Sequence, residues 1–292
     1  MSAAPVVGGQ AVIEGVMMRR QNRIAIAVRK PDQQLSLYEE TITTISEKYP
    51  LFKLPLLRGM AAFIESLLLG TRALTLSAAQ AAVEEEEELT GWQLTLTVGT
   101  ALLIAVGLFF LLPTVVMRFV SGFITAPPLL LNLLEGLLRL TIFLVYLLLV
   151  SRLPDIQRVF QYHGAEHKAV ACFEAGEELT VANARKYSPL HPRCGTSFLL
   201  LVMTVSIVFF SLFGWPDSIV RRLTIRLALL PLVAGFSYEL IRLAGRYRFF
   251  CYLTAPGLWL QRLTTREPDD QQLAVALHAL RAVVGAANEH EV

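Results

Sequence analysis

Two short motifs concentrate the residues of this chain that could bind a metal ion. His163, Glu166 and His167 form the pattern H-x-x-E-H, in a chain with only five histidines. On a helix the two histidines lie one turn apart on one face, and the glutamate lies on the adjoining row. In the inverted zincin motif, two histidines so placed hold zinc and the glutamate transfers protons. His191 and Cys194 follow as H-x-x-C and offer two more ligands.

The spacing of the motifs indicates which side chains can converge on one ion. Zinc takes three or four nitrogen, sulfur or oxygen ligands at about 2.0 to 2.3 Å. On a continuous helix Glu174 lies about 10 Å along the axis from His167, so it can contribute only if the helix breaks. The loop before His191 is long enough to fold back. We therefore expect a divalent metal site, with zinc as the metal, formed by His163, His167 and Cys194, with His191 as the fourth ligand.

Coordination number separates two functions for this site. Four protein ligands make a closed structural zinc, whereas three ligands and water make a catalytic ion with Glu166 as general base. A third interpretation needs no metal, because paired histidines in a loop can hydrogen-bond at a helix end. The motifs by themselves leave these three alternatives open.

The composition places both motifs in a membrane protein. Hydrophobic residues make up 54% of the chain and charged residues 17%, with a mean hydropathy of +0.52, as in integral membrane proteins. Four segments have the length and hydropathy of transmembrane helices, namely 94–113, 129–150, 198–214 and 223–244. The net charge of +2 and the absence of a basic stripe argue against nucleic-acid binding.

The lysines and arginines indicate the orientation of these spans. They are concentrated in the connection 151–197 and in the C-terminal tail, and cytoplasmic loops are enriched in such residues. We therefore expect a multi-pass protein of the plasma (inner) membrane with both termini and the His/Cys loop in the cytoplasm. No signal-peptide pattern is found at the N-terminus, so the first span itself would direct insertion. Cys172, Cys194 and Cys251 form no even framework, so disulfides are not expected.

The predicted fold class is a mainly α integral membrane protein with a small N-terminal α+β domain and a cytoplasmic helical tail. The expected sheet is antiparallel, with strands at 11–18, 24–29 and 35–38. A membrane-proximal helix from 59 to 82 and an acidic linker follow it. The expected divisions are an N-terminal domain at 1–93, a transmembrane hairpin at 94–150, the His/Cys loop at 151–197, a second hairpin at 198–244, and an interfacial segment with a final helix at 245–292.

Ionisable residues are rare inside membrane spans and usually face a bundle interior or a water-filled cavity. Glu135 and Arg139 are four residues apart, which allows an ion pair on one helix face. They form either part of a substrate or proton path, or a neutralised pair that fixes helix packing. Glu239 is the spanning carboxylate that could reach the histidine cluster from the cytoplasmic end of the fourth span.

Three stretches of the chain together resemble the YqhQ-like family of bacterial membrane proteins. These stretches are 8–19 (GGQAVIEGVMMR), 162–168 (YHGAEHK) and 191–198 (HPRCGTSF). The resemblance implies a membrane location and a metal role, but it supplies no reaction. The matching positions are His163, Glu166, His167, His191 and Cys194.

The first of these stretches also contains a carboxylate with two interpretations. Glu14 either points at the metal cluster as an extra ligand or pairs with Arg19 or Arg20. The glycine pair before it, Gly8 and Gly9, allows a close backbone approach or a tight turn near a site, or simply starts the first strand.

Our first functional hypothesis is a cytoplasm-facing, metal-dependent membrane hydrolase whose substrate is lipid-linked or membrane-embedded. The competing hypothesis is a non-catalytic assembly or scaffold protein with a closed structural zinc or no metal. A transporter ranks third, because four spans with one intramembrane ion pair form a thin pathway unless the protein oligomerises. The expected partners are the lipid bilayer and either another membrane protein or a second copy of the chain.

Overall fold

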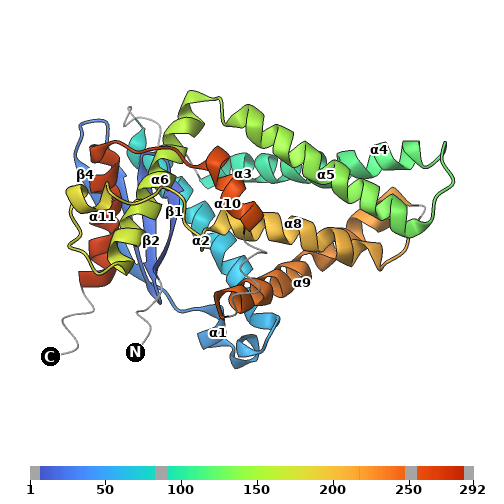
Figure 1. Ribbon diagram of the computed structural model, residues 1–292, viewed down its shortest axis with the longest axis horizontal. Helices are drawn as coiled ribbons and strands as arrows, with labels where there is room; N and C mark the ends of the chain where they lie inside the picture. The colour runs from blue at the N-terminus through green and yellow to red at the C-terminus, as the bar shows by residue number, and fades with distance from the viewer. Residues whose placement is uncertain (1–6, 83–90, 217, 247–254, 286–292) are drawn as a thin grey trace.

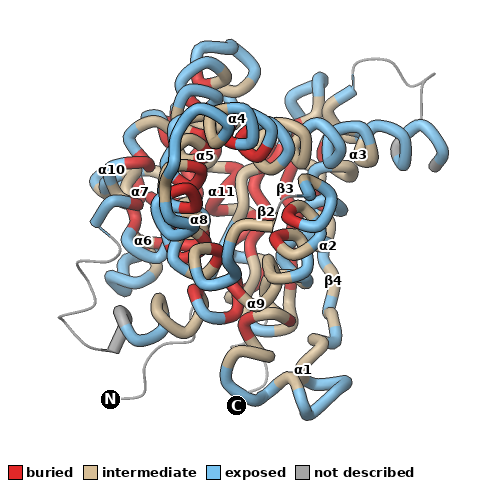
Figure 2. The backbone as a smooth tube through the Cα atoms, turned by 90° about the vertical axis from the view of Figure 1, so that its right-hand side faces the viewer, coloured by how far each residue is buried: buried red, intermediate tan, exposed pale blue. Residues whose placement is uncertain are grey.

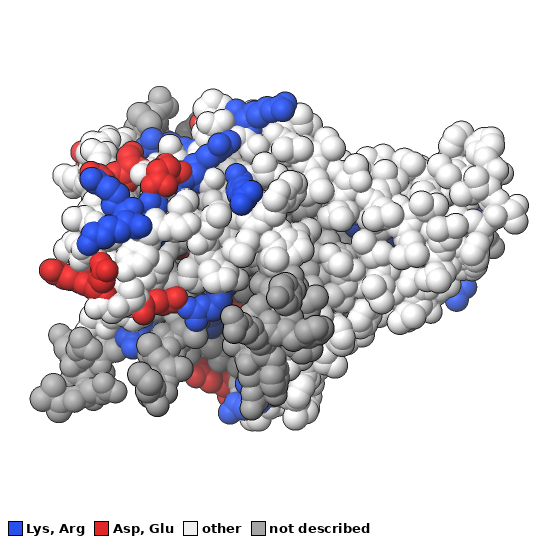
Figure 3. Space-filling model, viewed as in Figure 1, with Lys and Arg blue, Asp and Glu red and all other residues white. Residues whose placement is uncertain are grey.

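The computed structural model describes residues 7–82, 91–216, 218–246 and 255–285. One end holds a small sheet with helices packed against it, and long helices extend from there to the other end (Figure 1). Charged side chains gather over the sheet end, whereas the visible face of the extended helices is almost free of them (Figure 3). On this face the molecule therefore has a polar end at the sheet and an apolar end along the extended helices.

The sheet is an antiparallel meander in the order β1-β2-β3-β4. Its strands are β1 (Val7–Val12), β2 (Gly15–Arg20), β3 (Arg23–Arg29) and β4 (Leu35–Thr41). The single strand expected at 11–18 is wrong, because the chain turns at Ile13 and Glu14, where Glu14 has a φ of 51°. Gly15 begins the next strand. Only glycine fits at this position, because a Cβ there would lie 2.2 Å from the carbonyl oxygen of Ala27.

Helices make up most of the remaining described chain. Proline begins α5 and α6, because its fixed φ suits the first helical turn. The helices are α1 (Ile45–Lys48), α2 (Leu57–Ala81), α3 (Gly91–Val106), α4 (Leu112–Val120), α5 (Pro128–Val150), α6 (Pro154–Glu174), α7 (Val181–Ala184), α8 (Gly195–Ser211), α9 (Ile219–Arg246), α10 (Ala255–Thr264) and α11 (Asp270–Gly285), with a 3-10 turn at Pro50–Lys53 and a π-helical turn at Gly107–Leu111.

Both faces of the sheet are covered by helices. Ala25 and Ala27 of β3 face a core formed with α6 and α11, while Ile24, Ile26 and Val28 face α2. This is the strict alternation expected of a strand, and burial of both faces makes β3 almost continuously buried. Buried residues follow β2, β3 and α11 through the interior (Figure 2). The predicted segments 1–93, 151–197 and 245–292 therefore contribute to one shared core.

Three of the described helices are long and apolar enough to cross a membrane: Leu57–Ala81, Thr95–Val120 and Pro128–Val150. The last two correspond to the first two predicted spans, and the first is the helix expected to be membrane-proximal. The third predicted span falls in α8, a shorter apolar helix. The fourth falls in α9, which carries more charged residues than the other helices. The helices are compatible with a membrane protein, and the count of four spans stays a prediction.

A cluster of buried charges joins the helices of the apolar end. Glu135 contacts Arg139 at 3.2 Å, as the i, i+4 spacing predicts. It also accepts a hydrogen bond of 2.7 Å from Arg226 of α9 and one of 2.8 Å from Thr114 of α4. Arg222 lies 3.7 Å away, stacked over the Trp215 ring.

One carboxylate is therefore shared by three guanidinium groups. The pair that the sequence predicted belongs to a larger cluster with excess positive charge, rather than being an isolated neutralised pair. The cluster connects α4, α5 and α9. Its position supports a role in helix packing.

We expect the substitution Arg226→Leu to destabilise the fold, because it removes the buried hydrogen bonds that Arg226 donates to Thr114, Asn132 and Glu135. A buried polar group left without its partner costs about 1–3 kcal/mol. The free energy of unfolding in detergent micelles would measure the loss. Arg221→Leu is the matched control, since Arg221 is exposed on the same helix and its removal should change stability by less than about 0.5 kcal/mol. Equal losses in both variants would contradict this role for the cluster.

Candidate metal centre

Helix α6 carries the first motif and is fixed by its packing against the sheet. Tyr162, Ala165 and Ala169 are fully buried in the core shared with α11 and the strands. The helix is unbroken from Pro154 to Glu174, so His163 and His167 lie on one face. Their ring centroids are 4.4 Å apart. The helical placement expected for H-x-x-E-H is therefore present.

The second motif meets this face of α6 from the start of α8. Cys194 is the N-cap residue of that helix, and its Sγ lies 3.1 Å from Nε2 of His163. One ligand atom from each of His163, His167 and Cys194 lies within 4.8 Å of the others. Ligands on a tetrahedral zinc ion are about 3.5 Å apart, so small side-chain movements would bring this group, here called the His/Cys cluster, to that spacing.

Backbone carbonyls determine which ring nitrogens face the cluster. Nδ1 of His163 lies 2.8 Å from the carbonyl oxygen of Thr264, and Nδ1 of His167 lies 2.6 Å from that of Pro189. A carbonyl can only accept, so each Nδ1 carries a hydrogen, and in the neutral form of each ring Nε2 carries the lone pair. Within the described chain, Nε2 of His167 is buried without a hydrogen-bond partner. Metal-binding histidines show this arrangement, in which the outer nitrogen donates to a carbonyl.

Burial sets the protonation of the cluster in the absence of a cation. It lowers the pKa of His167 to about 3, helped by the neighbouring His163, so this imidazole is neutral near pH 7. Burial also raises the pKa of the Cys194 thiol, against the hydrogen bonds that it makes with Thr196. A neutral imidazole is ready to coordinate, whereas the thiol would lose its proton to a metal ion that binds there.

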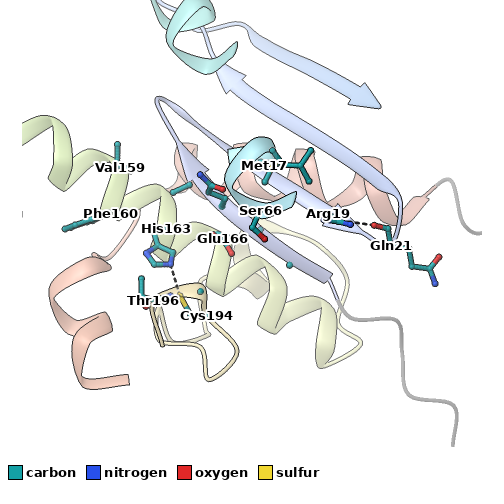
Figure 4. A pocket seen from close by; sticks show the side chains of 16 residues that line it. Met17, Arg19, Gln21, Ser66, Val159, Phe160, His163, Glu166, Cys194 and Thr196 are labelled. Atoms are coloured by element: carbon teal, nitrogen blue, oxygen red, sulfur yellow. Dashed lines mark hydrogen bonds between the residues drawn. The ribbon is translucent and has the colours of Figure 1, made fainter. Parts of the chain in front are cut away.

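Glu166 projects beside the cluster into a cavity. Figure 4 shows its carboxyl group close to His163 and Cys194. Burial raises its pKa to about 8; His163 and the Gly9 amide oppose this shift, and Cys194 adds to it. Strand β1 passes so close that a Cβ on Gly9 would lie 2.8 Å from the carboxyl carbon. A carboxyl group with a pKa near neutrality can both accept and release a proton.

The cavity lies between β1, α6 and the start of α8. Its volume is about 690 Å³, and His163, Glu166 and Cys194 form part of its wall (Figure 4). This volume is in the range of about 300–1,000 Å³ that is usual for small-molecule sites. The His/Cys cluster is thus open to a space large enough for a ligand.

His191, the expected fourth ligand, lies near the cluster but faces elsewhere. Its ring centroid is 5.7 Å from that of His167, and its Nε2 is 3.4 Å from the Glu174 carboxylate. Glu174 also pairs with Arg193. Because α6 continues unbroken, Glu174 lies away from the cluster. It contacts His191 and Arg193 of the second motif instead.

Two further candidate carboxylates, Glu14 and Glu239, pair with arginines that belong neither to the His/Cys cluster nor to the buried charges around Glu135. Glu14 lies in the β1–β2 turn, where it pairs with Arg158 and accepts a hydrogen bond of 3.2 Å from Tyr162. Among the described residues, the expected partners Arg19 and Arg20 bond to other groups instead of Glu14. Glu239 pairs with Arg58 of α2 at 2.6 Å. Neither carboxylate joins the His/Cys cluster.

Two groups at the site were missed because they are backbone atoms, namely the carbonyls of Pro189 and Thr264. No side-chain pattern marks them. Gly9 did have a signal, since a glycine pair permits the close approach that the structure shows. Cys251 and the acidic run at 84–88 lie outside the described residues.

Comparison with known proteins gives relatives but no reaction. A family model described as a protein of unknown function (DUF1385) matches residues 54–286. The uncharacterized protein YqhQ of Bacillus subtilis is 36% identical over 295 residues, which cover 96% of this chain and 92% of that protein. No solved structure matches. The family match contains the whole His/Cys cluster and Glu166, whereas the sheet lies outside it.

We expect Gly164→Ala to disturb the site through packing alone. A Cβ at Gly164 would lie 2.0 Å from the carbonyl oxygen of Arg266, next to the Thr264 carbonyl that orients His163. Overpacking of this kind costs about 1–3 kcal/mol, measurable as a lower melting temperature. Gly8→Ala is the control, because no atom lies within 4 Å of its added Cβ. A Gly164→Ala protein as stable as the Gly8→Ala protein would show that the chain after α10 does not pack this tightly.

Proposed function

The chain belongs to the DUF1385 family of proteins of unknown function, and from the geometry of its site we propose that it is a zinc-dependent hydrolase acting on a membrane-associated substrate. One observation carries the proposal. Nε2 of His167 is buried without a hydrogen-bond partner among the described residues and belongs to the same group of ligand atoms as Nε2 of His163 and Sγ of Cys194. An unsatisfied buried polar atom costs about 1–3 kcal/mol, and a cation at this point would remove that cost.

The donor set and the cavity favour a catalytic zinc ion. Two imidazole nitrogens and one thiolate are ligands that zinc prefers. A catalytic site has three protein ligands and keeps one position open, and the cavity borders this cluster. A zinc ion held there would act as a Lewis acid on a carbonyl or phosphoryl oxygen.

Glu166 would carry the proton that hydrolysis requires. When water cleaves an ester, its oxygen bonds to the acyl carbon, the carbon–oxygen bond breaks, and the leaving oxygen gains a proton. The Glu166 carboxyl faces the cavity beside the proposed ligands, so it is placed to take the proton of the attacking water and pass it to the leaving oxygen. Its Oε2 atom is buried and has no hydrogen-bond partner among the described residues.

The competing proposal is a scaffold protein with a closed structural zinc. It requires a fourth protein ligand, and His191 is near enough to supply one if its ring turns away from Glu174. The ion would then have no open coordination position for water or a substrate. The contacts of His191 with Glu174 favour the open site.

The short contact between Cys194 and His163 supports a second catalytic candidate. A thiol 3.1 Å from an imidazole that a carbonyl orients has the geometry of a cysteine nucleophile with its base. This arrangement leaves Nε2 of His167 without a role. The zinc site accounts for all three side chains, so we favour it.

We expect the purified protein to contain about one zinc ion per chain. His167→Ala and Cys194→Ala should lose it, whereas His278→Ala should keep it, because His278 lies in α11 away from the cluster. Elemental analysis by mass spectrometry measures the content. X-ray absorption should show two nitrogen ligands, one sulfur and one further light atom.

The same measurement separates the alternatives. Zinc retained in His191→Ala supports the open site, and zinc lost there supports the closed one. Wild-type protein without zinc, but with a Cys194 thiol that iodoacetamide alkylates rapidly, would replace the zinc site with the cysteine nucleophile.

We expect Glu166→Gln to bind zinc as the wild type does but to lose activity by about 10²–10⁴-fold, the usual contribution of a general acid–base. The readout is the lipid profile of cells that lack the protein and carry either variant, measured by mass spectrometry. Asp155→Asn is the control, since that carboxylate is exposed in the first turn of the same helix. A wild-type lipid profile with Glu166→Gln would exclude hydrolysis by this group.

A further inference from the structure

A second hollow joins the cavity of the His/Cys cluster. Its volume is about 810 Å³, and it lies between α2, α8, α9 and the edge of the sheet. The two hollows share six wall residues: Gly8, Gln10, Arg19, Ser66, Cys194 and Gly195. They therefore meet at the ligand Cys194, and a single molecule could occupy both.

The two hollows differ in the chemistry of their walls. The first has the His/Cys cluster and Glu166 at its wall. The second is lined mainly by apolar side chains of two helices, Phe63, Leu67 and Leu74 from α2 and Phe198, Leu199 and Val202 from α8. An occupant that matches both walls has a polar group at one end and an extended apolar chain at the other.

The apolar hollow, here called the α2/α8 compartment, borders the outer surface of the apolar helices. Helix α2 is one of the described helices able to cross a membrane. Leu67 and Leu199 line the compartment and are 54% and 44% exposed. In a bilayer these side chains would contact lipid directly, so the compartment would open toward the hydrocarbon rather than toward water.

The polar side chains where the two hollows meet suit an uncharged polar group of a ligand, such as an ester linkage, rather than a charged group. Arg19 lies where the hollows meet, but its guanidinium group pairs with Glu65 at 3.2 Å. Gln10 lines both hollows as well. Gly70 lets the Gln10 side chain approach α2 so closely that a Cβ on Gly70 would be 2.7 Å from the amide oxygen. These groups offer hydrogen bonds without an unbalanced charge.

We propose that the α2/α8 compartment holds the acyl chain of a membrane lipid, which enters sideways from the bilayer and places its ester linkage at the Cys194 end. The inference rests on the proposed function, because the linkage would meet the His/Cys cluster. Burial of the chain supplies affinity in proportion to the apolar area removed from solvent. The compartment thus selects amphipathic lipids, and the cluster acts on their linkage.

Photolabelling of the full chain tests this proposal. The protein is placed in nanodiscs of phosphatidylethanolamine and phosphatidylglycerol, with a trace of phosphatidylglycerol that carries a diazirine in one acyl chain. Labelled residues are mapped by mass spectrometry. We expect label on Val202, which is only 6% exposed and is reached from inside the compartment. Exposed residues of α3 such as Leu103 report general contact with the bilayer.

Two adjacent leucines provide a matched pair of variants. Leu67 lines the compartment and Leu68 does not, although both are exposed on α2. Leu67→Trp should lower labelling of Val202 by about tenfold, the equivalent of about two buried methylene groups. Leu68→Trp should leave it unchanged. Equal labelling of Val202 in both variants, or label confined to exposed residues such as Leu103, overturns the proposal.

Zinc content measured on the same samples keeps the two proposals distinguishable. Zinc present with no label on Val202 refutes the lipid compartment and leaves the hydrolase proposal standing. Localised label on Val202 without zinc supports the compartment and refutes the zinc-dependent reaction.

Discussion

Two hydrogen bonds between histidine rings and backbone carbonyls control the rest of the site. The Nδ1 atoms of His163 and His167 face the carbonyls of Thr264 and Pro189. Their Nε2 atoms are therefore free to face Cys194 and the point at which the three candidate ligand atoms converge. If either carbonyl moved, the ring beside it could turn and its lone pair would leave the cluster. The surrounding structure can be understood as the means of holding these two carbonyls against α6.

Three features hold the carbonyls in place. Gly164 lets the chain after α10 pass directly over α6. Gln261, fully buried, accepts a hydrogen bond from the backbone N–H of His191 and donates one to its carbonyl, each at 2.8 Å. The sheet and α11 bury the opposite face of α6. If any of these segments moved, buried polar groups would lose their hydrogen-bond partners. Deforming the arrangement therefore costs free energy.

The charged residues form exposed ion pairs in one part of the molecule and a buried cluster in another. Two ion pairs at the sheet end, Arg185–Asp270 and Lys186–Glu177, are largely exposed and contribute little each. The cluster around Glu135 is buried among apolar helices, where each guanidinium group needs its partners. The His/Cys cluster lies between these parts, because Cys194 begins α8 and α8 extends into the apolar end. A site at this boundary has access both to polar groups and to an apolar hollow.

Local patterns predicted the elements well where one physical signal dominated. Alternation of Ile24, Ile26 and Val28 identified β3, and the helix expected at 59–82 is present as α2. The break between β1 and β2 was missed, since Glu14 occupies a positive φ that its residue type does not announce. Arg226 was not expected beside Glu135, because the two residues are 91 positions apart and no local pattern relates them.

The sequence by itself determined the membrane-like composition, the helical register of His163, Glu166 and His167, and Cys194 as a further candidate ligand, since these follow from residue type and short spacing. The tertiary structure decided that His191 turns to Glu174 and that Glu14 turns to Arg158. It also decided which nitrogens face the cluster, through carbonyls 101 and 22 residues away. Every residue carries the same carbonyl, so only packing can select the two that orient a ring.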